Sequence, residues 1–228
     1  MAVINKIKDR RTSVDAIFDY LYAEISSLRL RPGDKISEAE IASQFGVSRQ
    51  PVRDAFSRLE NMDLLLIRPQ RATEVKRFSA REITKSRFVR SSVESEVLRR
   101  ATANCSAEDA EVLTACLEAQ AKVIEQNDYA AFSRLDYEFH KTMCEIAKVD
   151  FAFEVISAEK AKVDRLCNLS LAQEDRMPQL LGDHQNIAKA VISGDSEAAV
   201  DFGMLHLSRL DSTIATISSM NADYFEAE

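Results

Sequence analysis

The sequence predicts a mainly α-helical protein with two domains. An N-terminal winged helix-turn-helix is expected over residues 1–77, and an all-helical bundle of about six helices over residues 78–228. Apolar residues recur at spacings of three and four along most of the chain, which is the helical period. Only 5 Gly and 4 Pro interrupt the 228 residues. A chain of this length is sufficient for two cores, in domains of roughly 80 and 150 residues.

The composition is that of a folded protein without a membrane segment. Hydrophobic residues make up 46% of the chain, which is too many for a disordered protein. No apolar run approaches the roughly 20 residues that span a bilayer, and residues 1–6 lack the apolar core of a signal peptide. We therefore expect a cytoplasmic protein with no membrane partner. The four cysteines form no C-x-x-C pair, so we expect reduced thiols.

The charge is divided unevenly between the two predicted domains. Residues 1–77 carry 14 Lys and Arg against 11 Asp and Glu, a net charge of +3, whereas the remainder has a net charge of −10. A mildly basic head on an acidic body is compatible with nucleic-acid binding by the head alone.

The first predicted element is an amphipathic helix. Six apolar residues share one of its faces: Val14, Ile17, Phe18, Leu21, Ile25 and Leu28. The helix is expected to end before the turn at residues 31–34, where Pro and Gly are suited to a tight turn.

Two short helices joined by a turn are predicted next. Ser37 and Glu40 have the spacing of a capping box, and Gly46 is suited to the left-handed conformation in which helices often end. Ser48 is expected to cap the second helix, and Pro51 is compatible with its first turn. Two helices joined in this way predict a helix-turn-helix.

The second of these helices carries the predicted base-reading residues. In a helix-turn-helix the second helix enters the major groove with its N-terminal residues at the base edges. The residues at those positions are Ser48, Arg49, Gln50 and Arg53. Arg pairs well with guanine and Gln with adenine, so these residue types fit direct readout.

A hairpin is predicted to follow and to form the wing. Residues 64–67 are a short apolar strand candidate, residues 68–73 a polar turn, and residues 74–76 a returning strand. Arg68 and Arg71 at the tip would reach phosphates or the minor groove. The alternative is that these arginines, like those of the preceding helix, are solvated surface charges.

Residues 78–228 are predicted to form six amphipathic helices. The first begins after a second capping box at residues 79–82 and runs to about residue 102. The others are expected from residue 106, over residues 128–148, 151–173 and 178–193, and from residue 195 to about residue 220. An all-helical bundle is the architecture that this pattern favours.

All three histidines of the chain lie on apolar helix faces. Asp136 and His140 are four residues apart and point together, while His184 and His206 lie in the apolar stripes of the last two helices. Buried polar groups need partners, and a divalent transition metal would satisfy all four at once. Three imidazoles and one carboxylate suit zinc, with nickel and manganese as alternatives. The competing interpretation is that each histidine is satisfied by ordinary neighbours in the core.

An arginine also falls on an apolar face. Arg90 lies midway between two apolar residues in a spacing of seven, so it is expected to point inward. Glu94, four residues on, would neutralise it; alternatively, the guanidinium would bind the carboxylate of a ligand bidentately. Arg165 and Asn168 are further candidates for the same role.

The residues of the predicted head resemble the GntR family of bacterial regulators. The resemblance is carried by Leu30-Arg31-Pro32-Gly33-Asp34-Lys35-Ile36-Ser37-Glu38 and by Phe45-Gly46-Val47-Ser48-Arg49-Gln50-Pro51-Val52-Arg53-Asp54-Ala55. It places Arg31 with the six residues named above in the expected DNA-contacting set. The family usually has Gly after the recognition helix and another in the wing, where this chain has Asp63 and a Gly-free segment at residues 68–73.

The second domain resembles the FCD ligand-binding domain of the FadR-type branch of that family. The shared features are Arg90 with Glu94, Asp136 with His140, and His184 followed 22 residues later by His206. The resemblance implies that Asp136 and the three histidines hold a metal and that Arg90 faces the pocket. It also implies a homodimer and a small organic acid effector, such as a sugar acid or hydroxy acid, rather than a fatty acid.

These expectations describe a ligand-responsive regulator of operator DNA, more often a repressor than an activator. Two other functions stay open at this point. A metal-dependent enzyme on the helical bundle is one, although the sequence has no H-E-x-x-H motif and no obvious general base beside the metal set. A regulator with a purely structural metal and no effector is the other.

Overall fold

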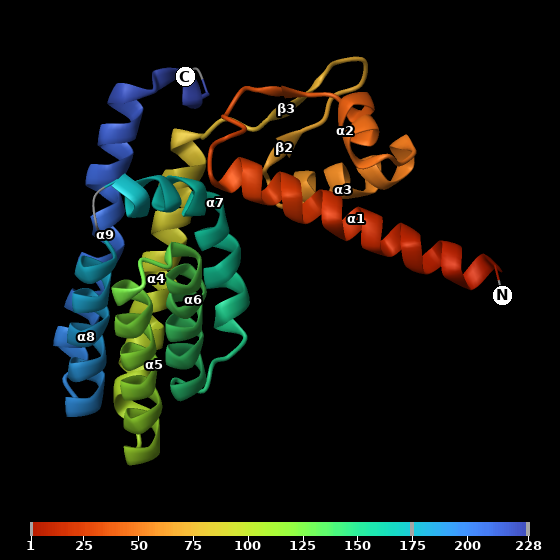
Figure 1. The fold of residues 1–228 in the computed structure, drawn as a ribbon. Coiled ribbons are helices and arrows are strands. Elements are labelled where there is room, and N and C mark those ends of the chain that lie inside the picture. Colours follow the sequence, from red (N-terminus) through yellow and green to blue (C-terminus); the bar gives the residue numbers. More distant parts are fainter. Residues whose placement is uncertain (1, 174–175, 227–228) are drawn as a thin grey trace. The chain divides into compact units, whose positions relative to one another are not determined.

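The computed structural model describes residues 2–173 and 176–226, and it is mainly helical (Figure 1). Its helices are α1 (Ala2–Ser26), α2 (Glu38–Phe45), α3 (Arg49–Asn61), α4 (Ala80–Asn104), α5 (Ala107–Glu125), α6 (Tyr129–Ile146), α7 (Ala152–Gln173), α8 (Met177–Ser193) and α9 (Ser196–Met220). Its strands are β1 (Lys35–Ile36), β2 (Leu65–Leu66) and β3 (Thr73–Val75). No helix among the described residues is long and apolar enough to cross a membrane.

The chain forms two compact units. The first, called here the winged unit, comprises the described residues up to Ala80 together with those from Ser218 onward. The second, the helical unit, comprises Arg81–Ile217. Each unit has its own hydrophobic core.

The winged unit has the predicted helix-turn-helix. Ser37 is the N-cap of α2 and accepts a hydrogen bond from the backbone N–H of Glu40 at 3.4 Å. Gly46 ends α2 at φ 64°, in the left-handed region that residues other than Gly enter at a cost. Ser48 is the N-cap of α3, but its side chain makes no capping hydrogen bond. Ser48 therefore stands at the predicted N-cap position but does not cap the helix with its side chain. Ser48 is exposed at the start of the helix.

A three-stranded antiparallel sheet completes the wing, in the order β1-β3-β2. Leu65 pairs with Val75 and Lys35 pairs with Glu74, so β3 lies in the middle. The hairpin of β2 and β3 was predicted, but β1 was not. Two residues are too few for an alternating pattern to be visible in the sequence.

Two residues other than Gly, one after α3 and one in the wing, adopt the conformation that Gly favours. Asp63, just after α3, has φ 61°, and Gln70, at the tip of the wing, has φ 58°. Asp enters this region more readily than most residues, and the Asp63 carboxylate also accepts a hydrogen bond from Lys76 of the wing. The wing therefore forms without glycine, at some local cost in backbone strain at Gln70.

The helical unit contains the predicted six helices, with termini within about two residues of the expected ones where these were given. Helix α5 packs against α6 and α8, and α6 also packs against α7. Helices α4 and α9 approach closely at Gly203, where an added Cβ would lie 2.4 Å from a methyl carbon of Leu98. This arrangement brings one face each of α4, α6 and α9 toward the same interior.

The segment after α9 returns to the winged unit. Phe78 and Phe225 form a parallel β-bridge. The Phe78 N–H donates to the Tyr224 carbonyl and the Glu226 N–H donates to the Phe78 carbonyl, each at 2.8 Å. Their rings lie 5.5 Å apart, and the Arg77 side chain donates to the carbonyl of Asp223 at 3.0 Å. Residues on both sides of the helical unit in sequence therefore build the winged unit together.

Candidate metal centre and DNA-contact surface

The predicted base-reading residues lie at the exposed start of α3. Arg49 is exposed, and within the described chain it makes no hydrogen bond or ion pair. Gln50 donates to the Asp54 carboxylate at 2.8 Å, and Arg53 pairs with Glu38 of α2 at 2.9 Å. The Arg53 side chain is more than half exposed, so its ion pair with Glu38 is weak in water. Arg53 can therefore exchange Glu38 for a phosphate or a base.

The predicted wing residues are also on the surface. Arg68 and Arg71 are exposed in the turn between β2 and β3, where they line a hollow together with Lys35 of β1. Arg31 is exposed before β1. The structure thus brings the cations of the wing together, and their role toward DNA remains a prediction.

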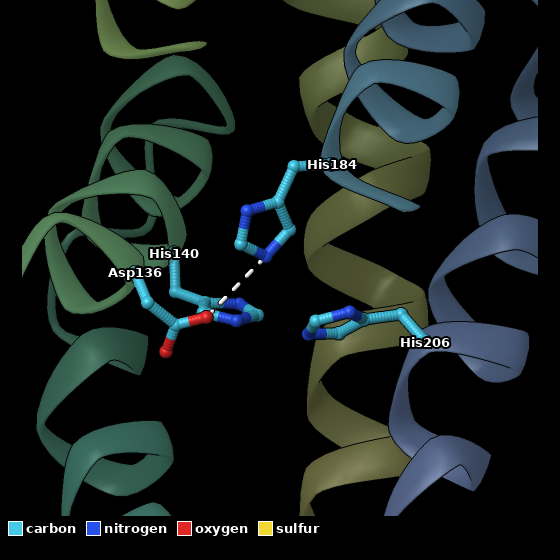
Figure 2. A group of neighbouring side chains, drawn as sticks. All are labelled: Asp136, His140, His184 and His206. Carbon is cyan, nitrogen blue, oxygen red and sulfur yellow. Dashed lines mark ion pairs between the residues drawn. The ribbon is translucent and has the colours of Figure 1, made fainter. Parts of the chain in front are cut away.

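The four predicted metal ligands converge in the interior of the helical unit (Figure 2). Helix α6 supplies Asp136 and His140, α8 supplies His184, and α9 supplies His206. One nitrogen or oxygen atom from each lies within 4.8 Å of those of the other three. All four residues are at most 8% exposed. The i, i+4 spacing on α6 and the apolar stripes of α8 and α9 produce this convergence.

A neighbouring side chain stands beside each imidazole. Glu94 Oε2 lies 3.1 Å from His140 Nδ1, and Gln120 Oε1 lies 2.7 Å from His184 Nδ1. Asp183 Oδ2 lies 3.6 Å from His206 Nδ1, beyond hydrogen-bond distance, and Arg209 of α9 holds Asp183 through two contacts of 3.1 and 3.2 Å. Partners of this kind orient the imidazoles of metal sites.

Three buried ring nitrogens that lack a hydrogen-bond partner favour a metal. His140 Nε2, His184 Nε2 and His206 Nδ1 are buried and have no hydrogen-bond partner in the described structure. Leaving such groups unpaired is costly, and a cation among them would remove that cost. Metal–nitrogen bonds of about 2.0–2.1 Å place opposite ligands at most roughly 4.2 Å apart, so a small contraction of the cluster would suffice.

The ionisation states are those that metal ligands require. Burial lowers the pKa of His184 and of His206 from the ordinary value, which keeps both imidazoles neutral at pH 7. Burial alone would raise the pKa of Asp136, but the Lys160 ammonium and the His184 ring hold it well below the usual range. His184 and His206 therefore present neutral nitrogen donors beside the ionised carboxylate of Asp136.

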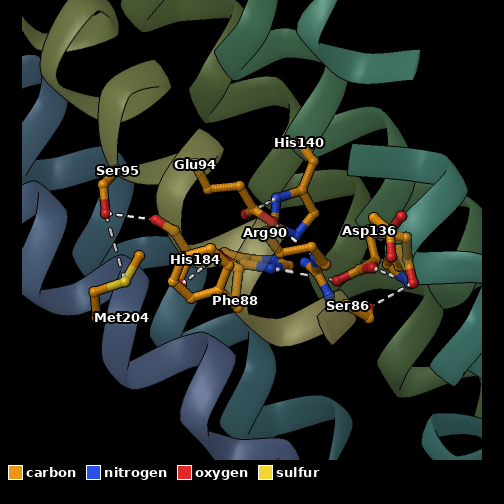
Figure 3. A network of polar contacts seen from close by, with 12 residues as sticks. Ser86, Phe88, Arg90, Glu94, Ser95, Asp136, His140, His184 and Met204 are labelled. Carbon is orange, nitrogen blue, oxygen red and sulfur yellow. Dashed lines mark hydrogen bonds and ion pairs between the residues drawn. The ribbon is translucent and has the colours of Figure 1, made fainter. Parts of the chain in front are cut away.

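The arginine predicted to bind an effector lies inside the helical unit. Arg90 is buried, and its Nε donates a hydrogen bond to Glu94 Oε1 at 2.7 Å. The neutralising role of Glu94 is thus present in the structure. Figure 3 shows Arg90 and Glu94 of α4 beside His140 in one polar network. Arg165 is also buried, and the side chain of Asn168 lies outside the described residues.

The cavity at this site is small. Glu94, His140 and His206 line it together with apolar residues, and its volume of about 10 Å³ is enough for roughly one water molecule. Sequence reasoning missed several residues around it: Gln120, Lys160, Asp183 and Arg209. Lys160 carried a signal, because it continues the buried stripe of Ile156 on α7.

Comparisons with known proteins match both units. The profile of the family described as "Bacterial regulatory proteins, gntR family" matches residues 13–75, and that of the "FCD domain" matches residues 87–209. The HTH-type transcriptional repressor RspR of Escherichia coli K12 is 31% identical over 228 residues, covering 100% of both chains. The "Probable D-xylose utilization operon transcriptional repressor" of Paenarthrobacter nicotinovorans is 28% identical over 87% of both chains.

Solved structures share the fold. McbR/YncC of E. coli superposes with a TM-score of 0.68 at 17% identity, covering 90% of this chain and 97% of the other. A GntR regulator from Rhodococcus sp. RHA1 gives a TM-score of 0.68 at 20% identity, covering 90% and 98%. At these identities the likeness concerns the fold alone.

Proposed function

The chain belongs to the GntR family of bacterial regulatory proteins and carries an FCD domain, and from this premise we propose that it is a repressor controlled by a small organic acid. As a member of this family it is a DNA-binding transcriptional regulator, and its relatives are regulators rather than enzymes. The effector would bind at a metal centre held by Asp136, His140, His184 and His206. The observation that carries the proposal is the convergence of three unpartnered buried imidazole nitrogens on one carboxylate.

The DNA-contacting part of the proposal concerns two places in the winged unit. Ser48, Arg49, Gln50 and Arg53 would face the base edges, and Arg31, Arg68 and Arg71 would contact phosphates or the minor groove. A homodimer would place two copies of α3 about one turn of DNA apart, on a site with two-fold symmetry. We propose that the protein acts in the cytoplasm.

The sensing part concerns the helical unit. Zinc fits the donor set, and nickel and manganese are alternatives. A divalent ion held there would offer open coordination positions to a carboxylate. Arg90 and Arg165 are the cations on α4 and α7 that would pair with the same anion, and Asn168 is a further candidate. The effector can shift the DNA-binding equilibrium only by its difference in affinity for the two states, typically about 1–3 kcal/mol.

One observation favours a second function, a regulator whose metal is purely structural. The cavity at the site has a volume of only about 10 Å³, too little for an organic acid unless side chains move. Under this alternative, removing the metal would unfold the helical unit, and no small acid would alter DNA binding.

The first experiment is the metal content of the purified protein, measured by mass spectrometry. Wild type is compared with His184→Ala/His206→Ala and with Gln185→Ala, an exposed neighbour on α8. We expect about one metal per chain in wild type and in the control, and its loss in the double variant. Wild type that stays metal-free after reconstitution with Zn²⁺, Ni²⁺ or Mn²⁺ would refute the metal centre.

The second experiment measures operator binding with a panel of sugar acids and hydroxy acids. The operator is first selected from random duplex DNA with the full-length protein. We expect at least one acid to weaken binding by wild type and to have no effect on the double variant. Binding that no acid changes, by a protein that unfolds when its metal is removed, would favour the structural metal instead.

A further inference from the structure

A buried lysine lies directly beside the candidate metal ligands. Lys160 of α7 is only 7% exposed and shares a helix face with the buried residues Ile156 and Val163. Lysine is almost never fully buried without a partner, because removing an ammonium ion from water is costly. Its position therefore calls for an explanation in terms of its neighbours.

Two of its neighbours belong to α6. Lys160 Nζ lies 3.0 Å from Asp136 Oδ2, and the ammonium also sits 4.1 Å from the centre of the Tyr137 ring. A carboxylate and an aromatic face are the two groups that stabilise a buried cation. Helix α6 thus holds the ammonium with two consecutive residues, one of which is a candidate metal ligand.

The two oxygens of Asp136 face different groups. Oδ1 lies 3.4 Å from His184 Nε2, within the cluster of ligands, whereas Oδ2 contacts Lys160. The same carboxylate therefore serves as a ligand candidate on one side and as the partner of a fixed positive charge on the other.

We propose that Lys160 acts as a built-in cation, which balances Asp136 when no metal is bound, opposes metal binding, and makes that binding depend on a small anion. This inference rests on the metal centre proposed above. It adds a role for Lys160, a residue outside the predicted ligand set, in linking metal binding at that centre to anion binding.

The physical reason is repulsion between like charges at short range. A divalent ion bound by Asp136 would share that carboxylate with the ammonium, and two cations in a poorly screened interior repel strongly. The single negative charge of Asp136 is smaller than the combined positive charge of the ammonium and a divalent ion. Arg90, one of the predicted anion-binding residues, is already paired with Glu94. A carboxylate ion that enters with the metal would supply the missing negative charge and would accept a hydrogen bond from Lys160.

The test is the affinity for Zn²⁺ alone, measured by competition with a zinc indicator dye. Wild type is compared with Lys160→Met, which removes the charge, and with Lys160→Arg, which keeps it. Lys141→Met is the matched control, because Lys141 lies on α6, the helix that carries Asp136, but its side chain is about half exposed. We expect Lys160→Met to bind Zn²⁺ about tenfold more tightly or better, and Lys160→Arg and Lys141→Met to stay near wild type.

The dependence on an anion is measured in the same assay. Sodium acetate replaces sodium chloride at constant ionic strength. We expect acetate to strengthen Zn²⁺ binding by wild type severalfold more than binding by Lys160→Met. An equal effect on both proteins, or Zn²⁺ binding by Lys160→Met that is unchanged or weaker, would overturn the role of Lys160.

The metal-free protein provides a check on folding. Lys160→Met leaves the Asp136 carboxylate buried without this partner, so we expect a lower melting temperature without metal and a larger rise on adding Zn²⁺. The double variant Lys160→Met/Asp136→Asn should regain metal-free stability, because it removes both charges. If wild type binds none of Zn²⁺, Ni²⁺ and Mn²⁺, the proposed metal centre itself is wrong. If wild type binds but the variants do not differ, only the role of Lys160 is wrong.

Discussion

The imidazoles of His184 and His206 are buried together, and this makes the metal-free protein sensitive to acid. Burial lowers the pKa of each ring below the ordinary value of about 6.5 that it regains in the unfolded chain. Below pH 6.5 the unfolded chain therefore binds more protons than the folded protein. By linkage, the stability contributed by the neutral rings is present above this pH and is lost as the pH falls.

We predict that the free energy of unfolding of chelator-treated protein falls between pH 6.5 and pH 5. The slope has an upper limit of about 1.4 kcal/mol per pH unit for each of the two rings. Denaturant unfolding at several pH values measures it. His184→Gln/His206→Gln should show a flatter profile over this window, and an equally steep profile in that variant would contradict the assignment.

Cys144 is a second buried group whose chemistry follows from its surroundings. Burial, aided by the nearby carboxylates of Glu94 and Glu145, raises the pKa of its thiol to about 12. We predict that Cys144 resists iodoacetamide at pH 8.5 in the folded protein, because only the thiolate reacts. Peptide mass spectrometry after timed labelling measures this. The half-buried Cys105 should be modified faster, and equal rates at the two sites would contradict the prediction.

At this scale the sequence was sufficient to bring the four candidate ligands together, but not to identify the side chains around them. Asp136 and His140 could be paired because their spacing on a helix fixes their common direction. Lys160 and Gln120 approach them from other helices, and a contact of this kind depends on how helices pack. Burial on an apolar stripe was the available signal for Lys160. Nothing in the spacing indicates that its partner is Asp136.

At the scale of elements, helix and turn termini carry residues in a conformation that suits glycine. Lys148 follows α6 with φ 59°, and Gln70 has φ 58° at the tip of the wing. Neither residue type is favoured there.

We predict that Lys148→Gly and Gln70→Gly each raise the free energy of unfolding by up to about 1 kcal/mol, because glycine adopts this conformation without strain. Denaturant unfolding measures both. Lys148→Ala is the control, since it shortens the side chain but keeps the strained backbone. A Gly variant no more stable than its Ala counterpart would show that the backbone there is not strained.

The recognition helix α3 carries the prediction on DNA. Arg49 is exposed without a partner in the described chain, so it is available to a guanine. We predict that Arg49→Ala lowers the discrimination between the selected operator and a site mutated at one base pair by about 1–3 kcal/mol. Fluorescence anisotropy with both DNA duplexes measures it. Arg134→Ala, which removes an exposed charge of α6, should leave the discrimination unchanged. Discrimination that survives Arg49→Ala would remove this residue from the base-reading set.

Elements with a long periodic pattern could be predicted well, and short ones could not. Helix α9 was expected to end near residue 220 and ends at Met220, one turn after the last buried apolar residue, Ile217. Strand β1 has only two residues, and its existence depends on pairing with β3 far along the chain. The sequence around β1 gives no signal that predicts this pairing.

At the scale of the whole molecule, the winged unit is assembled from two distant parts of the chain. Phe78 is buried, and its ring and backbone both contact Phe225. Sequence analysis placed a domain boundary at residue 78 because a capping box follows it. The return of residues 221–226 to this boundary could not be predicted, because one short segment carries no periodic signal.

We predict that Phe225→Ala lowers the stability of the winged unit by about 1–3 kcal/mol, less than a fully buried phenylalanine would, because Phe225 is only half-buried. Hydrogen exchange of amides in α3 and β3 measures this. Met220→Ala is the control, since Met220 is 74% exposed. Exchange rates in α3 and β3 that are the same as in wild type would show that the contact is dispensable.

The Phe78–Phe225 pairing also bears on the order of events during translation. At roughly 5–20 residues per second, the ribosome takes roughly 7–28 s to progress from residue 80 to residue 218. Throughout that interval the nascent helix-turn-helix exists without its final segment. The winged unit gains its full set of contacts only after every helix of the helical unit has been made. A prematurely terminated chain would therefore meet operator DNA with a winged unit that lacks its C-terminal segment.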